Sequence, residues 1–176
     1  MKKYEFTGEM IEKFGVTLRR IRALKDVKQG NNVIAIKGET GGWIAEEKNL
    51  SQDGNAWVYG NARVYGNAQV SGNALVYGNA RVYGDAWVSG NAWVSGDAHI
   101  IKLTDILTVG PICSRDATTT FFRDKSGGIS VVCGCFLGTL AEFAEKVTAT
   151  HGDNKHAKAY RAAVEFAKVQ MEEGQK

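Results

Sequence analysis

A six-residue repeat occupies the middle of the chain and restricts the fold more than any other feature of the sequence. Over residues 54–100 a frame of valine, any residue, glycine, asparagine or aspartate, alanine and any residue returns without interruption. Glycine permits tight backbone corners at which side chains would clash. Period six is typical of a parallel β-helix, in which short strands joined by sharp turns stack coil on coil.

The spacing of the apolar residues distinguishes this segment from a disordered tract of glycine and asparagine. The 176-residue chain has 21 glycines but a single proline. An aliphatic residue and an alanine each return at every sixth position, as a packed interior requires. The aliphatic positions are Val58, Val64, Val70, Val76, Val82, Val88, Val94 and Ile100. The alanine positions are Ala56, Ala62, Ala68, Ala74, Ala80, Ala86, Ala92 and Ala98.

This run resembles the hexapeptide-repeat family over residues 54–100. The resemblance implies a left-handed parallel β-helix of triangular section with three repeats, or about 18 residues, in each turn. We therefore expect a mainly β fold in which the β-helix is followed by a small α+β domain. Residues 1–53 are expected to form N-terminal strands and a capping coil, residues 54–101 the β-helix, and residues 102–176 the α+β domain with two final helices.

The two flanking segments carry weaker signals than the repeat. Before it, residues 3–6 and 33–36 read as strands, and Ile44, Leu50 and Ala56 are again six apart, which indicates a capping coil. After it, we expect strands at residues 103–109, 118–123 and 129–136, with a hairpin turn at residues 124–128. Thr139 and Glu142 form a capping box for a helix over residues 140–150. The second helix has the apolar seam Tyr160, Val164, Ala167 and Met171.

A turn of about 18 residues sorts the variable positions into columns, with rungs about 4.8 Å apart. The first column contains Trp57, Leu75 and Trp93. A contiguous exposed stripe of this kind usually marks an interface. Members of the resembled family commonly form threefold trimers along the prism faces, so we expect a homotrimer through these three residues, and two trimers could pair into a hexamer.

The second column contains Arg63, Arg81 and His99, with Tyr65 and Tyr83 beside it. Arginines stacked one rung apart repel each other unless an anion or a carboxylate lies between them. The column has two interpretations. The arginines are solvated and pack on the neighbouring tyrosines, or they line a site for an anionic ligand. The third column, with Gln69 and Trp87 flanked by Ser71 and Ser89, is mixed in character.

A second candidate cluster lies in the C-terminal segment. Hydroxyl groups together with arginine suit phosphate or ribose, because both supply hydrogen-bond donors to oxygen atoms. The alternative is that these residues stabilise a turn and a strand. The cluster consists of Ser114, Arg115, Thr118, Thr119 and Thr120, with His151 near a helix junction.

Charge, apolar runs and cysteines exclude several classes of partner and site. With 22 basic and 19 acidic side chains the chain lacks the positive excess that DNA binding requires. No apolar run approaches the roughly 20 residues of a membrane span, and no secretory signal opens the chain, so we expect a cytoplasmic protein. Three cysteines do not indicate a disulfide framework. Cys113, Cys133 and Cys135 with His151 could form a zinc site, but reduced thiols are expected, with neither metal nor cofactor.

Two stretches, VTLRRIRALKDV and GGWIAEEKNLSQDGNAWVYGNA, resemble small proteins encoded by bacteriophages and prophages, over about residues 14–100. With the basic column, this resemblance suggests a non-catalytic trimer that binds host nucleotide immune signals, such as cyclic nucleotides, and sequesters them. Arg63, Arg81, His99 and the Ser114–Thr120 cluster would contact phosphate, while Tyr65 and Tyr83 would stack on bases.

Two other classes of function stay open. The resembled family includes acyltransferases that use a histidine base, for which His99 is the candidate within the repeat, although no orienting carboxylate is apparent. It also includes carbonic anhydrases with three metal-binding histidines, whereas this chain offers His99, His151 and His156. A structural or interaction protein is the third class, in which the C-terminal unit would bind a protein partner.

Overall fold

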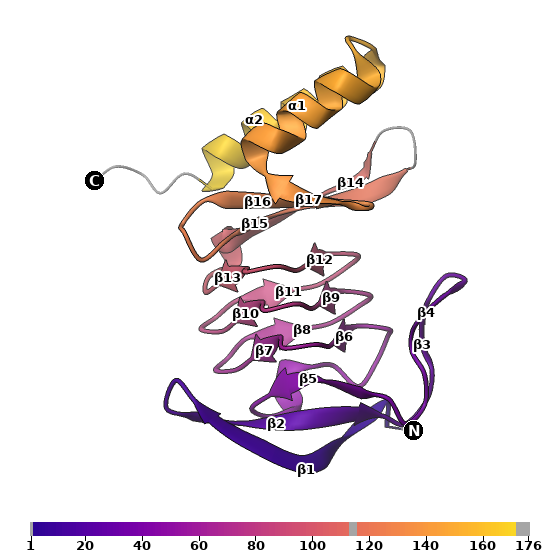
Figure 1. Ribbon diagram of the computed structural model, residues 1–176, viewed down its shortest axis with the longest axis vertical. Coiled ribbons are helices and arrows are strands. Elements are labelled where there is room, and N and C mark those ends of the chain that lie inside the picture. The colour runs from indigo at the N-terminus through magenta and orange to yellow at the C-terminus, as the bar shows by residue number, and fades with distance from the viewer. Residues whose placement is uncertain (1, 113–115, 172–176) are drawn as a thin grey trace.

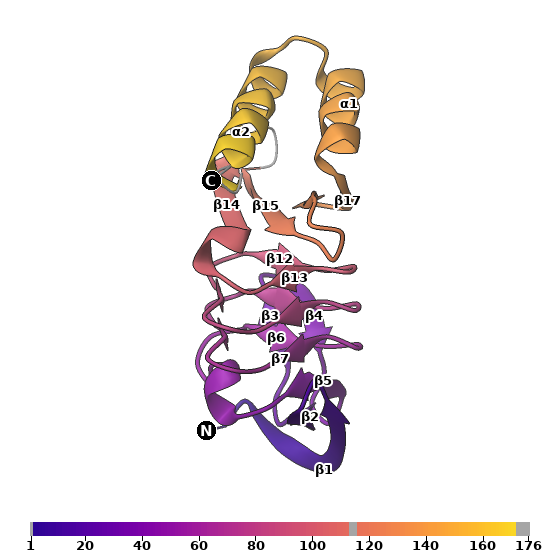
Figure 2. The ribbon, with the colours of Figure 1, turned by 90° about the vertical axis from the view of Figure 1, so that its left-hand side faces the viewer.

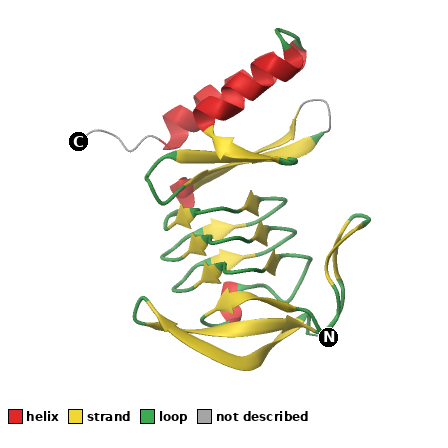
Figure 3. Cartoon of the chain, in the orientation of Figure 1, coloured by secondary structure: helices red, strands yellow, loops and turns green. Residues whose placement is uncertain are grey.

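The structure, a computed structural model, describes residues 2–112 and 116–171. A β-solenoid of about three turns connects an N-terminal hairpin to a C-terminal sheet that carries two helices (Figure 1). Both α-helices belong to the C-terminal end, and the rest of the described chain is built from strands, turns and two short 3-10 helices (Figure 3). The expected mainly β fold, a β-helix followed by two C-terminal helices, is confirmed.

The solenoid is built from two-residue strands that pair in parallel with strands 18 residues away. The three faces contain β6–β9–β12, β7–β10–β13 and β8–β11. Their bounds are β6 Trp57–Val58, β7 Arg63–Val64, β8 Gln69–Val70, β9 Leu75–Val76, β10 Arg81–Val82, β11 Trp87–Val88, β12 Trp93–Val94 and β13 His99–Ile100. Every aliphatic and alanine position of the repeat is buried. The period-six pattern therefore fills the interior, and residues 18 apart share a column.

The asparagines of the repeat form hydrogen-bonded columns at the corners of the solenoid. In each column the side-chain amide of one turn donates to the side-chain oxygen of the next turn. The columns are Asn55–Asn73–Asn91, Asn61–Asn79–Asp97 and Asn67–Asp85, with donor–acceptor distances between 3.1 and 3.5 Å. Two of the three columns thus end in a carboxylate, which accepts hydrogen bonds and needs no further acceptor of its own.

The first coil begins before the repeat and is two residues longer than the later ones. Ile44 of β5 (Thr40–Ile44) pairs with Val64, and Leu50 bridges to Val70, so the partners are 20 residues apart. The 3-10 turn Glu47–Asn49 lies between them. The interval from Leu50 to the next buried aliphatic residue, Val58, is eight residues rather than six. In the series Ile44, Leu50 and Ala56, the first two residues therefore occupy aliphatic positions of the repeat and the third occupies an alanine position.

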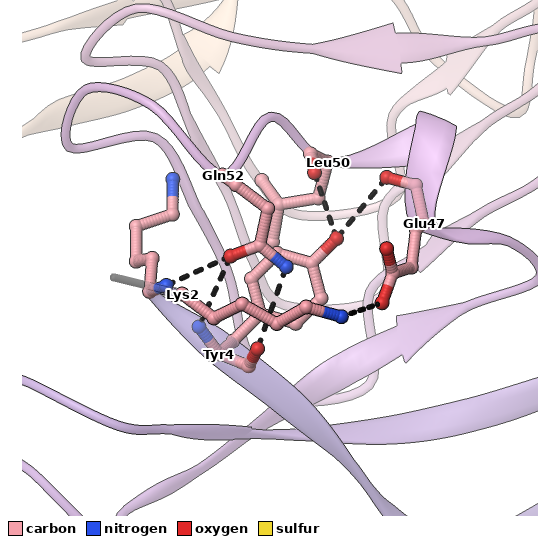
Figure 4. A network of polar contacts seen from close by, with 6 residues as sticks. Lys2, Tyr4, Glu47, Leu50 and Gln52 are labelled. Atoms are coloured by element: carbon pink, nitrogen blue, oxygen red, sulfur yellow. Dashed lines mark hydrogen bonds and ion pairs between the residues drawn. The ribbon is translucent and has the colours of Figure 1, made fainter.

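The N-terminal segment forms a long antiparallel hairpin that closes the lower end of the solenoid. The hairpin comprises β1 (Tyr4–Lys13) and β2 (Val16–Ala23), and β1 extends the strand expected at residues 3–6 as far as Lys13. β2 pairs with β5 and so joins the hairpin to the β7–β10–β13 face. Figure 4 shows Tyr4 held against this coil, with its hydroxyl donating to the Leu50 carbonyl at 2.7 Å. Gln52 accepts the Lys3 amide hydrogen at 2.8 Å.

A second, smaller hairpin, β3 (Val27–Gln29) with β4 (Asn32–Ala35), runs along the side of the solenoid (Figure 1). Gln29 Nε2 donates to the Asn73 carbonyl, which fixes the tip of this hairpin to the second turn. Val27 and Ala35 are buried in the same cluster as the solenoid interior. The small hairpin therefore covers one solenoid face from within the same chain.

The C-terminal unit is a four-stranded antiparallel sheet with both helices on the side away from the solenoid (Figure 2). Its elements are β14 Ile106–Ile112, β15 Ala117–Arg123, β16 Ile129–Cys133, β17 Phe136–Thr139, α1 Leu140–His151 and α2 Lys155–Met171. The expected capping box at Thr139 and Glu142 is present, Gly152 follows α1, and the seam Tyr160, Val164, Ala167 and Met171 is buried. Neither helix of the described residues combines the length and apolar character that crossing a membrane requires.

Two expected strands of this unit differ from the observed ones. The strand predicted for residues 103–109 starts at Ile106, because Leu103–Asp105 is a 3-10 turn whose Asp105 carboxylate accepts the amides of Ile101 and Lys102. The strand predicted for residues 129–136 is broken by a turn at Gly134, whose φ is +59°. Cys133 ends β16 and Cys135 lies in the turn, so the two thiols do not share one side of a single strand.

Candidate anion-binding site

The apolar column of Trp57, Leu75 and Trp93 lies on a solenoid face that other parts of the chain cover. Its register is as expected, since Leu75 pairs with both Trp57 and Trp93. However, Trp57 is 1% exposed and Leu75 is 2% exposed within the single chain, and Trp93 is half-buried. Tyr4 packs edge-on against Trp57, and the β3–β4 hairpin lies beside the column. The assignment of Trp57 and Leu75 to a trimer contact is therefore wrong, because the chain itself buries them.

The basic column continues beyond the repeat into the N-terminal hairpin. Arg81 pairs with Arg63 on one side and with His99 on the other, as the 18-residue period predicts. Arg63 also pairs with Trp43 of β5, which in turn pairs with Arg20 of β2. The sequence did not indicate this extension, because the first coil is two residues longer than the repeat.

An aromatic column stands next to these arginines. Tyr65 and Tyr83 stack with their centroids 4.9 Å apart, Phe14 stacks on Tyr65 at 5.8 Å, and His99 lies 5.2 Å from Tyr83. Phe14 comes from the tip of the β1–β2 hairpin, which the sequence analysis missed. Each tyrosine thus has a ring on both sides, so the expectation that Tyr65 and Tyr83 stack on bases conflicts with the structure. Phe14 is 52% exposed and is the accessible ring of this column.

The guanidinium groups of this column lack acidic partners. Arg81 donates from Nη2 to the Tyr65 hydroxyl at 2.6 Å, and its Cζ lies 3.7 Å from the centre of the Phe14 ring. Within residues 2–112 and 116–171, no carboxylate pairs with Arg63 or Arg81. In the same ranges the buried Nε atoms of Arg20, Arg63 and Arg81 have no hydrogen-bond acceptor. Such unsatisfied buried donors are uncommon in proteins and call for an acceptor.

A cavity of about 440 Å³ opens beside these arginines. It is lined by Phe14, Arg63, Asn79, Arg81, Asp97, Ala98, His99 and Lys125. Among its ionised groups, three cations face one carboxylate, Asp97, which accepts the amide of Asn79 at 3.3 Å. A neighbouring hollow of about 410 Å³ shares His99 and Lys125 with it. We refer to the first cavity as the arginine pocket.

The carboxylates of the neighbouring hollow are already bonded. Asp105 accepts two backbone amides, and Asp124 accepts from Ser126, Gly128 and Ser130. Burial acts to raise the pKa of Asp124, but these hydrogen bonds outweigh it and hold the pKa below its ordinary value. Both carboxylates therefore stabilise turns and leave the cations of the arginine pocket without a close acidic partner.

His99 contributes an imidazole ring to the arginine pocket. Burial, reinforced by the charge of Arg81, lowers the pKa of its imidazole below the ordinary value of 6.5. Its Nε2 shares a hydrogen bond of 2.6 Å with the Tyr83 hydroxyl, whose own pKa is raised by burial. In the described residues no carboxylate hydrogen-bonds the ring, so the structure shows no acidic group that would orient His99 as a general base.

The second predicted cluster does not join this pocket. Thr119 and Thr120 are buried: the Thr119 hydroxyl donates to Cys133 Sγ at 3.3 Å, and Thr120 Oγ1 accepts the Trp93 amide at 3.1 Å. These two hydroxyls are therefore used inside the protein, contrary to the expectation that they contact a ligand. The reason is that β15 is covered on both faces: Thr120 faces the last solenoid coil, whereas Thr119 faces the opposite side, where Cys133 contacts Tyr160 of α2.

The other described residues of the second cluster, Thr118 and His151, lie apart from the arginine pocket. Thr118 lines a different cleft, together with Trp93. His151 ends α1 and lies against His156 and Tyr160, with ring centroids 5.9 and 5.8 Å away. Ser114 and Arg115 lie outside the described residues, as does Cys113. Among the described residues, the structure consequently gathers Arg63, Arg81 and His99 but does not bring Thr118, Thr119, Thr120 or His151 to them.

The cysteines and histidines of the described chain do not assemble into a metal site. Cys133 is half-buried and lies 3.4 Å from the Tyr160 hydroxyl, and Cys135 is exposed. No group of three or more histidine, cysteine, aspartate or glutamate side chains suited to a metal ion occurs in residues 2–112 and 116–171.

Comparison with known proteins shows a similarity that is confined to the repeat. A family model described as the YdcK beta solenoid repeat matches four overlapping segments, residues 56–72, 68–84, 76–90 and 80–96. All four lie within the stacked turns. A search of curated proteins found no match to the chain. The similarity therefore concerns the architecture of the repeat, and any function has to be argued from the site.

Proposed function

We propose that this β-solenoid repeat protein is a non-catalytic binding protein for a small anionic ligand, and that the ligand is a nucleotide. The observation that carries the proposal is the stacking of Arg63 and Arg81 on adjacent rungs beside a cavity of about 440 Å³. Neither guanidinium has an acidic partner in the described residues. A phosphate between them would offset their repulsion and accept their N–H groups.

The remaining residues of the pocket suit the other parts of a nucleotide. Lys125 adds a third cation at the rim, and the Asn79 amide faces the same cavity. Phe14, with about half of its surface exposed, is the ring on which a base would stack. The nucleobase contact of this proposal thus moves from Tyr65 and Tyr83 to Phe14. The two tyrosines keep a supporting role, because Tyr65 holds the Arg81 guanidinium in place.

Binding without turnover would make the protein a sequestering agent. His99, the acyltransferase candidate, shares its Nε2 with Tyr83, which favours a binding role over catalysis. On the resemblance of two sequence stretches to phage and prophage proteins, we propose that the ligand is a cyclic nucleotide immune signal. Its capture in the cytoplasm of an infected host would block antiphage defence.

A homotrimer stays part of the proposal, but through a different surface. The Trp57 and Leu75 side chains are covered, whereas Trp87 on the β8–β11 face is 54% exposed. Its indole Nε1 donates to Ser71 Oγ at 3.1 Å, which fixes the ring against the sheet. Light scattering of the intact protein and of Trp87→Ala tests this: a threefold mass that falls in the variant supports the contact, and equal masses contradict it.

Titration calorimetry with a panel of cyclic mononucleotides, dinucleotides and trinucleotides tests the proposed ligand. Arg63→Gln is expected to weaken binding about 10- to 100-fold, because hydrogen bonds to charged groups contribute about 1.5–3 kcal/mol. Lys146→Gln removes one positive charge from an exposed site on α1 and serves as the matched control, with unchanged affinity. The bound ligand should be recovered unaltered after denaturation of the protein.

Three results would separate the competing functions. Absence of heat with the whole panel removes the nucleotide proposal. Binding of coenzyme A with turnover that is lost in His99→Ala would favour the acyltransferase. Equal loss of binding in Arg63→Gln and Lys146→Gln would show that net charge, and not the arginine pocket, attracts the ligand.

A further inference from the structure

A second cleft, on a different side of the solenoid, has the opposite chemical character to the arginine pocket. It has a volume of about 340 Å³ and lies between the tip of the β3–β4 hairpin and the C-terminal sheet (Figure 1). Three parts of the chain meet there, since Gln29 belongs to the hairpin, Trp93 to the last turn and Thr118 to β15. Its lining is Gln29, Gly30, Asn55, Asn73, Asn91, Trp93, Asp116, Ala117, Thr118, Val132 and Gly134.

The floor of this cleft is the one asparagine column that does not end in a carboxylate. Asn55 donates to Asn73 at 3.4 Å, and Asn73 donates to Asn91 at 3.1 Å. The other two columns end in Asp85 and Asp97, which accept and have no donor to satisfy. Asn91 ends its column as an amide, and its Nδ2 has no acceptor in the described residues. The column therefore presents two N–H donors at the cleft that the protein does not use.

The remaining walls supply an apolar ring and hydrogen-bonding groups without positive charge. Trp93 is half-buried, and its backbone is fixed by the hydrogen bond to Thr120. Asp116, the residue before β15, and Thr118 of β15 also line the cleft. No lysine, arginine or histidine of the described residues lines the cleft. Among the described residues, a phosphate-bearing ligand would therefore meet one carboxylate and no cation, which disfavours an anion.

We propose that this cleft binds a neutral saccharide. A side-chain amide offers both donors and an acceptor, and so does the hydroxyl group of a sugar, so a column of amides matches a row of hydroxyls. The Asp116 carboxylate accepts further hydroxyl hydrogens, and the indole of Trp93 provides an apolar surface for the carbon-bound face of a sugar ring. Asn91 completes its hydrogen bonds by donating to the ligand. This site does not depend on the arginine pocket or on its proposed ligand.

The probes for this site are maltotriose, cellotriose and triacetylchitotriose, titrated separately against the intact protein and followed by ligand-observed NMR. At least one is expected to bind saturably with a dissociation constant near the millimolar range. Asn91→Asp keeps the side-chain shape and the hydrogen bond from Asn73 but removes both free donors. It should weaken binding about 3- to 10-fold, as expected for the loss of neutral hydrogen bonds.

Three further variants make the result specific. Asn61→Asp substitutes an exposed asparagine in a column at another corner and should leave sugar binding unchanged, as should Arg63→Gln. Trp93→Phe keeps an aromatic ring of smaller area and should weaken binding while the thermal transition shows the protein folded. Failure of all three sugars to bind overturns the proposal. So does binding that Asn91→Asp leaves unaltered, and so does saturable binding of an uncharged hexapeptide probe in place of the sugars.

Discussion

At the scale of single residues, polar side chains near the N-terminal end of the solenoid donate hydrogen bonds that backbone amides donate elsewhere. Inside the solenoid, each turn donates backbone amides to the carbonyls of the turn above, as Trp57 does to Ala74 at 2.9 Å. The first coil cannot supply all of these donors. The buried Asn49 side chain donates instead to the carbonyls of Gly66 and Ala68, at 3.1 and 2.8 Å. Lys3 Nζ donates to the Ala56 carbonyl at 2.8 Å.

Asn49→Ala should therefore destabilise the protein by about 1–3 kcal/mol, because it leaves buried carbonyl groups without donors. Urea unfolding followed by circular dichroism measures the change. Asn61→Ala is the matched control: its amide is exposed and makes one contact of 3.5 Å, so its effect should stay within about 0.5 kcal/mol. Similar losses in the two variants would contradict the assigned role of Asn49.

Lys3 predicts a dependence of stability on alkaline pH. Burial lowers the pKa of its ammonium group to about 8, from the ordinary 10.5. Between these values the unfolded chain binds a proton that the folded chain does not, so stability should rise as pH increases, by on the order of 1 kcal/mol per pH unit. The rise should start near pH 8. Tyr4, whose pKa burial raises, acts in the opposite direction above pH 10.

The comparison with Lys3→Met isolates this contribution, because Tyr4 is present in both proteins. Thermal unfolding between pH 7.5 and 9.5 should show a steeper gain in the unsubstituted protein than in Lys3→Met. Parallel curves for the two proteins would mean that Lys3 is charged normally in the folded state.

At the scale of elements, the repeat turns a short backbone corner into a stackable unit. The corner glycines have φ between +62° and +69°, a conformation that side chains disfavour. At Gly54 a Cβ atom would also lie 2.5 Å from the carbonyl oxygen of Gly72 in the turn above. At Gly90, in the last turn, a Cβ atom would meet nothing within 4 Å.

Gly54→Ala and Gly90→Ala thus separate the two reasons for glycine at a corner. Gly90→Ala should cost about 1 kcal/mol from backbone strain alone. Gly54→Ala should cost clearly more, because the backbone of the next turn has to move as well. Melting temperatures of the two variants, measured side by side, decide the matter, and an equal decrease would contradict the close approach between turns.

The elements that could be predicted from the sequence are those whose apolar spacing repeats. Eight copies of one frame fixed the columns, and the Thr139 box fixed the start of α1. The β1–β2 hairpin was missed because its turn, at Phe14 and Gly15, falls inside a charged segment without a turn signature. Burial of Trp57 was missed because the six-residue period predicts on which face of the solenoid a residue lies, but not which other segment covers that face. For the same reason Phe14 could not be placed in the arginine pocket.

The hydroxyl cluster shows the limit of composition as a guide to a site. Thr118, Thr119 and Thr120 are consecutive in sequence, but alternation along β15 and its contact with the last coil give them different surroundings. The register of β15 on β14 and β16 is set by pairing over the whole sheet. Local residue chemistry alone does not contain that information.

At the scale of the whole molecule, the chain uses its own N-terminal segment to cover the solenoid. The β3–β4 hairpin lies beside the β6–β9–β12 face (Figure 1), and its ends are close together, since the Gly38 amide donates to the Ala23 carbonyl at 2.8 Å. The single chain is thereby protected on a face that would otherwise expose two large apolar side chains.

Replacing residues 25–37 by a short glycine-serine linker should therefore lower the melting temperature. It should also make the apparent mass increase with protein concentration, because the exposed apolar face would associate. Light scattering and dye binding to apolar surface measure both effects. Gln29→Ala, which removes the hydrogen bond to Asn73 but keeps the cover, should behave like the intact protein. Unchanged mass and dye binding after removal of the hairpin would contradict its covering role.

The uniform stacking of the turns has a consequence for the distance between the two ends of the molecule. Each copied 18-residue segment would raise the C-terminal sheet by about 4.8 Å while leaving both terminal units intact. The cleft between the β3–β4 tip and the C-terminal sheet would widen by the same distance. The basic column would gain one more residue. The number of turns thus sets the distance between the two ends of the molecule. Tandem duplication of one segment would change the size of both the cleft and the arginine pocket at once.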